Sequence, residues 1–96
     1  MKISGVIIPS GGSPTVLNEQ TLNVVGWSLQ GDYYQYNFSN VLIQESSVVT
    51  FVPNNSSILD ASTSLLLPLI TSNFGSCVIY SQFLPLNNIT GTIIIQ

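Results

Sequence analysis

The segment WSLQGDYYQYNFSNVLIQESSVVTF, residues 27–51, decides the fold class of this chain. Its clearest pattern is YQYNF, residues 34–38, in which large apolar rings occupy every second position and amides lie between them. Because successive side chains of a β-strand point to opposite faces, this alternation predicts a strand with one buried and one polar face. The Gly-containing turn at residues 30–32 predicts a hairpin that joins this strand to the apolar residues 24–27.

Further short apolar segments separated by turn residues follow the same pattern along the chain. Strands are expected at residues 3–8, 21–25, 48–52, 77–82 and 88–96, and residues 65–70 read as a strand or a buried irregular segment interrupted by Pro68. The segments 44–47 and 71–75 are expected to be turns, and one helical turn is expected at residues 58–64, with Ser57 or Asp60 as N-cap. About seven short strands at roughly 8–12-residue spacing predict an all-β fold, a small antiparallel β-sandwich of immunoglobulin-like or jelly-roll-like type.

The chain of 96 residues has room for a single domain. Residues 15–96 are expected to form the β-sandwich. Residues 1–14 are expected to form an N-terminal strand or arm followed by a Gly/Ser/Pro linker, with Ile3 and Val6 among its apolar side chains. No signal peptide is expected, because the apolar part ends at Pro9 and no small-residue cleavage site follows.

Charged residues make up only 5% of the chain, against roughly 25% in an average soluble protein. The net charge is −3 and Lys2 is the only basic residue. Nucleic acid is therefore not an expected partner, because phosphate contacts need clustered Lys and Arg. Membrane insertion is not expected either, because the longest apolar run, residues 65–70, is far shorter than the ~20 residues that span a bilayer as a helix.

The scarcity of charged residues favours a protein that functions within a larger assembly, because charged surfaces and strand edges normally prevent sheet proteins from associating. The segment Ile93-Ile94-Ile95 points the same way. A strand that is apolar on both sides is expected to be covered on both, by the core and by another layer or subunit.

The residues needed for most catalytic chemistry are missing from this sequence. Without His or Arg there is no Ser-His-Asp triad, no Cys-His pair and no arginine clamp, so an enzyme is not expected. The four acidic residues are scattered and no calcium-binding loop occurs, so neither a metal nor a cofactor is expected. Cys77 lies in an apolar run and is expected to be buried and unreactive.

The aromatic residues allow a binding function, because tyrosine and tryptophan stack on sugar rings and anchor protein interfaces. We expect Trp27 and Phe38 to belong to the core, whereas Tyr33 points opposite to Tyr34 and is the best candidate for an exposed ring. Asp32 and Tyr33 lie at the predicted hairpin turn. A partner is expected to contact these two residues or the N-terminal arm, through Ile3 and Val6.

The order of features from Trp27 onward resembles a small β-domain found at the C-termini of tail-fibre, baseplate and related virion proteins of tailed bacteriophages. The resemblance covers about 70 of the 96 residues. Its elements are a Trp, a Gly and a Tyr opening an alternating strand, a strand ending in proline, a strand preceded by glycine, and a proline before the last strand: Trp27, Gly31, Tyr33, Tyr36, Val49–Pro53, residues 75–80 and residues 85–96.

The resemblance implies a bacteriophage virion structural protein without catalytic residues, a small tail, fibre, baseplate or capsid-decorating module. Its expected location is the virion, and its expected partners are other virion proteins and further copies of itself, with a trimer favoured. The N-terminal arm would dock onto the particle. The alternative is a carbohydrate-binding or host-receptor-binding adhesin module that reads a surface glycan, and a third possibility is a secreted bacterial surface domain of immunoglobulin-like type.

Overall fold

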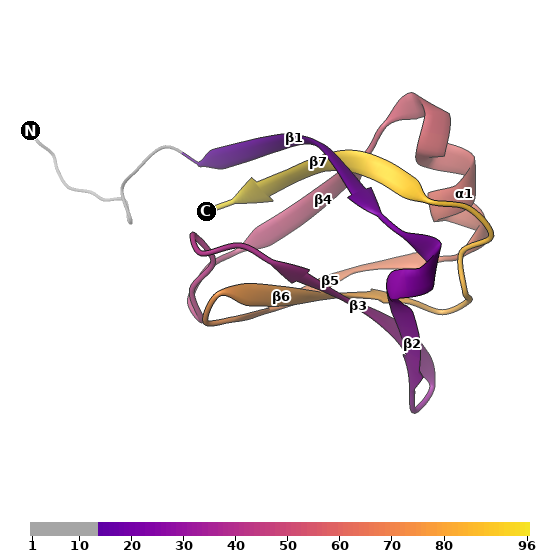
Figure 1. Ribbon diagram of the computed structural model, residues 1–96, viewed down its shortest axis with the longest axis horizontal. Coiled ribbons are helices and arrows are strands. Elements are labelled where there is room, and N and C mark those ends of the chain that lie inside the picture. Colours follow the sequence, from indigo (N-terminus) through magenta and orange to yellow (C-terminus); the bar gives the residue numbers. More distant parts are fainter. Residues whose placement is uncertain (1–13) are drawn as a thin grey trace, which may run out of the picture.

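The computed structural model describes residues 14–96, which form two antiparallel sheets packed face to face, with one short helix at one end (Figure 1). One sheet has the strand order β1-β7-β4 and the other β2-β3-β6-β5. The predicted antiparallel β-sandwich of about seven strands is thereby confirmed. The strands are β1 Thr15–Leu22, β2 Trp27–Gln30, β3 Tyr33–Ser39, β4 Val49–Pro53, β5 Leu66–Asn73, β6 Ser76–Ser81 and β7 Ile89–Ile95. The predicted arm, with Ile3 and Val6, lies outside the described residues.

The last strand, β7, is central in its sheet, where it pairs with the first strand on one side and with β4 on the other. In a constant-type immunoglobulin domain the last strand lies at a sheet edge. The strand order therefore differs from the immunoglobulin one. Within residues 14–96 no helix is long and apolar enough to cross a membrane.

The predicted hairpin is present as β2 and β3. Gln30 pairs with Tyr33, so Gly31 and Asp32 form a two-residue turn, and Gly31 has the left-handed φ of 69° that such turns require. The aromatic side chains of β3 that alternate along the strand are half-buried against the core, as predicted, and Trp27 is buried. The Trp27 and Tyr36 rings pack with centroids 5.4 Å apart.

The start of this hairpin was predicted wrongly. Residues 21–25 do not run as a strand into Trp27, because β1 ends at Leu22 and Val24–Gly26 form a 3₁₀ turn that carries the chain from one sheet to the other. Long-range contacts hold this turn: the Asn88 side chain accepts a hydrogen bond from the Val24 N–H at 2.8 Å. A Cβ at Gly26 would collide with the Tyr36 ring, so any larger residue would have to displace this ring from its packing against Trp27.

The core is built around β7, whose inward side chains are fully or almost fully buried. Ile89, Ile93 and Ile95 point between the sheets, whereas the intervening Ile94 is half-buried on the outer side, opposite Val16 and Thr50. The expected second cover over Ile94 is not supplied by residues 14–96.

Two other boundaries refine the sequence predictions. The helix α1, Ile58–Thr63, occupies the predicted helical turn, and Ser57 stands at its N-cap without a side-chain capping bond, because its hydroxyl accepts a hydrogen bond from the Thr90 N–H instead. The turn expected at residues 71–75 is shorter than predicted: β5 continues to Asn73, and only Phe74 and Gly75 turn, with Gly75 at φ 83°. Pairing with β6 overrides the turn-forming tendency of those residues.

Candidate interaction surfaces

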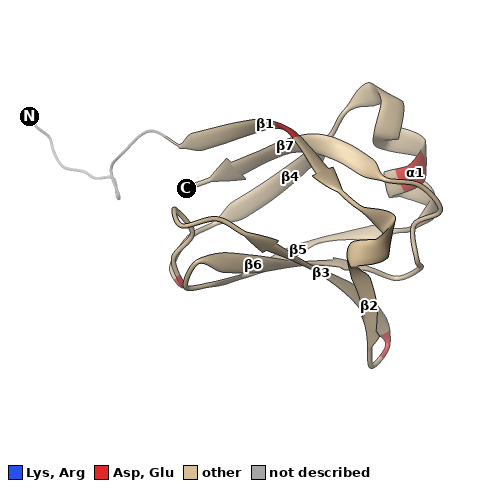
Figure 2. Cartoon of the chain, viewed as in Figure 1, with Lys and Arg blue, Asp and Glu red and all other residues tan. Residues whose placement is uncertain are grey.

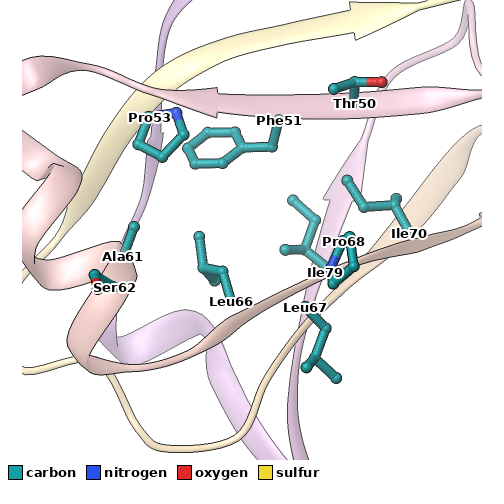
Figure 3. Close-up of a pocket in the computed structure, with 10 residues that line it drawn as sticks. All are labelled: Thr50, Phe51, Pro53, Ala61, Ser62, Leu66, Leu67, Pro68, Ile70 and Ile79. Carbon is teal, nitrogen blue, oxygen red and sulfur yellow. The ribbon is translucent and has the colours of Figure 1, made fainter.

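A pocket of about 420 Å³ opens along one side of the sandwich, between the edge strands β4 and β5 and beside α1 (Figure 3). We call it the edge pocket. Phe51 and Leu66 extend into it from opposite sheets, and Leu67 points away. The lining residues are Thr50, Phe51, Pro53, Ala61, Ser62, Leu66, Leu67, Pro68, Ile70 and Ile79.

The chemistry of the edge pocket is almost entirely apolar. Among residues 14–96, Thr50 and Ser62 are the only lining residues with a hydroxyl group, and no charged residue lines the pocket. It therefore offers neither a general acid nor a general base, and what it accommodates is aliphatic or aromatic surface.

Unpaired backbone flanks this pocket on both sides. In the described part of the chain β4 pairs only with β7, and β5 pairs only with β6, so each sheet ends here in a strand with one open edge. Proline at positions 53 and 68 and a bulge between Leu66 and Ile70 interrupt these edges in part. A polypeptide in extended conformation could pair with the remaining length.

Many of the exposed apolar residues belong to two groups of segments that lie at opposite ends of the sandwich (Figure 1). At one end, α1 adjoins the connection between β6 and β7 through hydrogen bonds from the Gln82 and Phe83 N–H groups to the carbonyls of Leu65 and Ser64. The exposed residues of this helix end are Ile58, Leu59, Leu65, Phe83, Leu84 and Leu86.

The opposite end, the loop end, is formed by the connection between β3 and β4 and by the turn between β5 and β6. Asn40 and Gly75 hold the two together, since the Asn40 N–H donates to the Gly75 carbonyl at 3.0 Å. Val41 and Phe74 are 92% and 86% exposed, so almost none of either side chain is covered by the described fold. The exposed residues of the loop end are Val41, Leu42, Val48 and Phe74.

The predicted contact residues Asp32 and Tyr33 lie at the tip of the β2–β3 hairpin, which projects from the rest of the molecule (Figure 1). Both are exposed, as predicted for Tyr33, whose exposed fraction is 44%. No ion pair joins Asp32 to another residue of the described range 14–96. Asp32 is a solvated turn residue.

Tyr33 belongs to a larger surface that sequence reasoning missed, the outer face of the four-stranded sheet. Gln35 pairs directly with Tyr80, Tyr33 lies two residues before Gln35 on the same face, and the Tyr80 hydroxyl lies 3.0 Å from the Thr71 hydroxyl. We call Tyr33, Gln35, Thr71 and Tyr80 the tyrosine face. The signal was the alternation of residues 77–80, which together with a buried Cys77 puts Tyr80 on the outer face. The pairing of β6 with β3, which brings Tyr80 beside Gln35, is not contained in that pattern.

Acidic side chains are few and lie far apart (Figure 2). Glu19 accepts hydrogen bonds from the Asn54 side-chain amide, and Asp60 accepts one from Asn87. No group of three potential metal ligands occurs among residues 14–96. Cys77 is fully buried, as predicted, and burial raises the pKa of its thiol to about 11, so little reactive thiolate forms near neutral pH.

Comparisons of this chain with models of protein families, with curated proteins and with solved structures found no match. A function for this protein must therefore be inferred from its exposed surfaces. Three of them are distinctive: the edge pocket with its two open strands, the pair of apolar ends, and the uncharged tyrosine face.

Proposed function

We propose that this protein is a bacteriophage virion structural protein, a small accessory module of the tail, fibre, baseplate or capsid that acts through protein–protein assembly. The observation that carries the proposal is the apolar surface at the two opposite ends of the sandwich. Isolated exposed apolar side chains are ordinary, but clusters of them mark surfaces that a partner covers.

The charge distribution supports the same proposal. Residues 14–96 contain four acidic and no basic side chains, so most of the surface lacks the charges that keep sheet proteins apart (Figure 2). Two apolar ends on one subunit suit heterologous contacts, in which one end of a copy meets a different surface of the next copy or of a neighbouring virion protein. The resemblance of residues 27–96 to β-domains of phage virion proteins supports placing that assembly in a phage particle.

The assembly proposal predicts that one acidic substitution at the loop end weakens self-association. Replacing Phe74 with aspartate is expected to raise the dissociation constant of the oligomer by at least about tenfold, or ~1.4 kcal/mol. The Phe74 ring is exposed in the single chain and would be buried in the oligomer, and a carboxylate in its place would have to lose its bound water on association. Multi-angle light scattering across a concentration series measures the change. The adjacent Asn73→Asp variant adds the same charge at an exposed polar position and should associate almost as the unaltered protein does.

A well-behaved monomer at tens of micromolar would contradict self-assembly. The virion location is tested separately, by mass spectrometry of purified particles and by the neighbouring genes. Absence of the protein from particles, with no capsid, portal or tail genes nearby, would overturn that part of the proposal.

The tyrosine face favours a second candidate function, recognition of an uncharged glycan. It combines the Tyr33 and Tyr80 rings with the Gln35 amide and the Thr71 hydroxyl, and tyrosine rings with neighbouring amides are suited to stack on sugar rings and to hydrogen-bond their hydroxyls. Trp27 and Tyr34 do not contribute to it, because Trp27 is buried and Tyr34 packs against the core.

If the tyrosine face binds a glycan, removal of one tyrosine ring should weaken glycan binding. Tyr33→Ala is expected to weaken glycan binding by at least about tenfold, because an exposed ring that stacks on a ligand acts as an anchor. A glycan array followed by calorimetry measures the change. Thr50→Ala, on the outer face of the other sheet, is the matched control and should bind normally. No signal on the array or with bacterial cell walls would exclude this function.

A further inference from the structure

The edge pocket lies where the edge strands of the two sheets, β4 and β5, face each other along one side of the sandwich. One sheet has three strands and ends in β4, whereas the other has four and ends in β5. Between them Phe51 and Ile70 line the pocket and are only partly buried. A strand added to the open edge of β4 would lie beside this apolar surface and cover part of it.

The chain contains one apolar segment outside the described residues, residues 3–8 with the sequence ISGVII. As a strand, it would place Ile3 and Ile7 on one face and Val6 and Ile8 on the other, so either orientation offers two branched apolar side chains to the pocket. Its six residues would span about 20 Å, comparable to the roughly 17 Å of the five-residue β4. Pro9 would end it, since proline lacks the N–H that a ladder requires.

The distance from the start of β1 to the β4 edge helps to decide whether this segment comes from the same copy or from another copy of the chain. Thr15 and Val49 both pair with Ile95, so a strand beyond β4 lies about 14 Å from the start of β1, at ~4.8 Å for each of three strand spacings. The linker, residues 9–14, reaches about 20 Å when fully extended. Within one copy it would also have to pass around the connection between β3 and β4, which is tied to β5 where the Ser72 hydroxyl donates to the Ser47 carbonyl at 2.7 Å. The linker leaves only about 6 Å for that detour, whereas the arm of a neighbouring copy can approach the β4 edge without it.

We infer that residues 3–8 of a second copy of this chain add as a strand to the open edge of β4 and insert apolar side chains into the edge pocket. The inference rests on the proposed self-assembly and gives it a specific contact. Main-chain hydrogen bonds to β4 would supply affinity, and the pocket would select the aliphatic side chains. Because the arm and the pocket are different surfaces, repetition of this contact closes a ring, such as a trimer, when the rotation between copies permits.

Disulfide trapping between two variants, each with one added cysteine, tests the contact in the full-length chain. One variant carries Val6→Cys or Ile7→Cys in the arm, and the other carries Val52→Cys at the outer side of β4. Cys77 can remain, because it is buried. Mixing the two under mild oxidation is expected to give a disulfide-linked heterodimer. The matched control is Val25→Cys, which is 89% exposed on the 3₁₀ turn at the other side of the sandwich and should give no such product with the arm variants.

The outcomes separate this inference from the proposed function. Heterodimers with Val52→Cys and not with Val25→Cys support the arm contact. A chain carrying both cysteines that forms only an intrachain disulfide overturns the second copy as the source, and no specific cross-link overturns docking of the arm. If light scattering still finds an oligomer in either case, assembly stands and uses the apolar ends instead. If it finds only monomer, the proposed assembly fails as well.

Discussion

Replacing Ile93 with alanine is expected to lower the free energy of unfolding by about 3–4 kcal/mol. Ile93 is fully buried in the central strand β7, where it pairs with Leu17 on one side and Phe51 on the other. Truncation removes the apolar contacts of the side chain and leaves a cavity, because two hydrogen-bonded neighbours hold the strand in place and prevent the sheets from closing over the gap.

Chemical denaturation monitored by the fluorescence of Trp27 measures this change, with the protein concentration held constant because self-association contributes to apparent stability. Ile94→Ala is the matched control. The same side chain is removed one residue further along, but from the half-buried outer face, so a loss below about 1 kcal/mol is expected. Equal losses for the two variants would contradict the inward orientation of Ile93.

Replacing Gly91 with alanine is expected to cost about 3 kcal/mol or more, although the change adds only one methyl group. A Cβ at this position would meet the Val52 carbonyl oxygen at 2.3 Å, and the Phe51 ring and the Pro53 Cα at 2.8 Å. Two of these three atoms belong to the backbone of β4 and cannot rotate away. The strands β4 and β7 would have to separate locally, which would disturb both the pairing and the edge pocket.

Gly75→Ala provides the comparison, because its added Cβ meets nothing within 4 Å. Its cost comes only from the left-handed backbone, with φ 83°, and is expected to be about 1 kcal/mol. Thermal unfolding of both variants measures the difference. If Gly91→Ala proved no more destabilising than Gly75→Ala, the close approach of β4 to β7 would be wrong.

These two predictions concern the same strand that supports the candidate contact surface. The residues around Gly91 position Phe51 and Pro53, which line the edge pocket. Damage to the pairing of β4 with β7 should therefore reduce both the stability of the fold and any docking at the β4 edge. An arm variant such as Val6→Cys, by contrast, alters no residue of the described fold, so its effects report on the contact.

Local sequence pattern determined much of the fold class of this protein. The alternation in residues 34–38 and the Gly31-Asp32 turn predict the hairpin, because the two-residue period and the left-handed glycine act over a few residues. The scarcity of charged residues indicates a surface suited to association, and this inference needs only the composition of the chain. The burial of Cys77 and the exposure of Tyr33 were predicted from the residues next to them in the sequence.

Tertiary structure alone decided which of these surfaces lie together. The edge pocket joins residues of β4 and α1 to residues of β5, and the tyrosine face joins Tyr33 to Tyr80, across separations along the chain that no local period encodes. The wrongly predicted strand at residues 21–25 has the same origin, because Asn88 and the Tyr36 ring impose the 3₁₀ turn from a distance. Strand order and register fix these neighbours, and both depend on long-range burial.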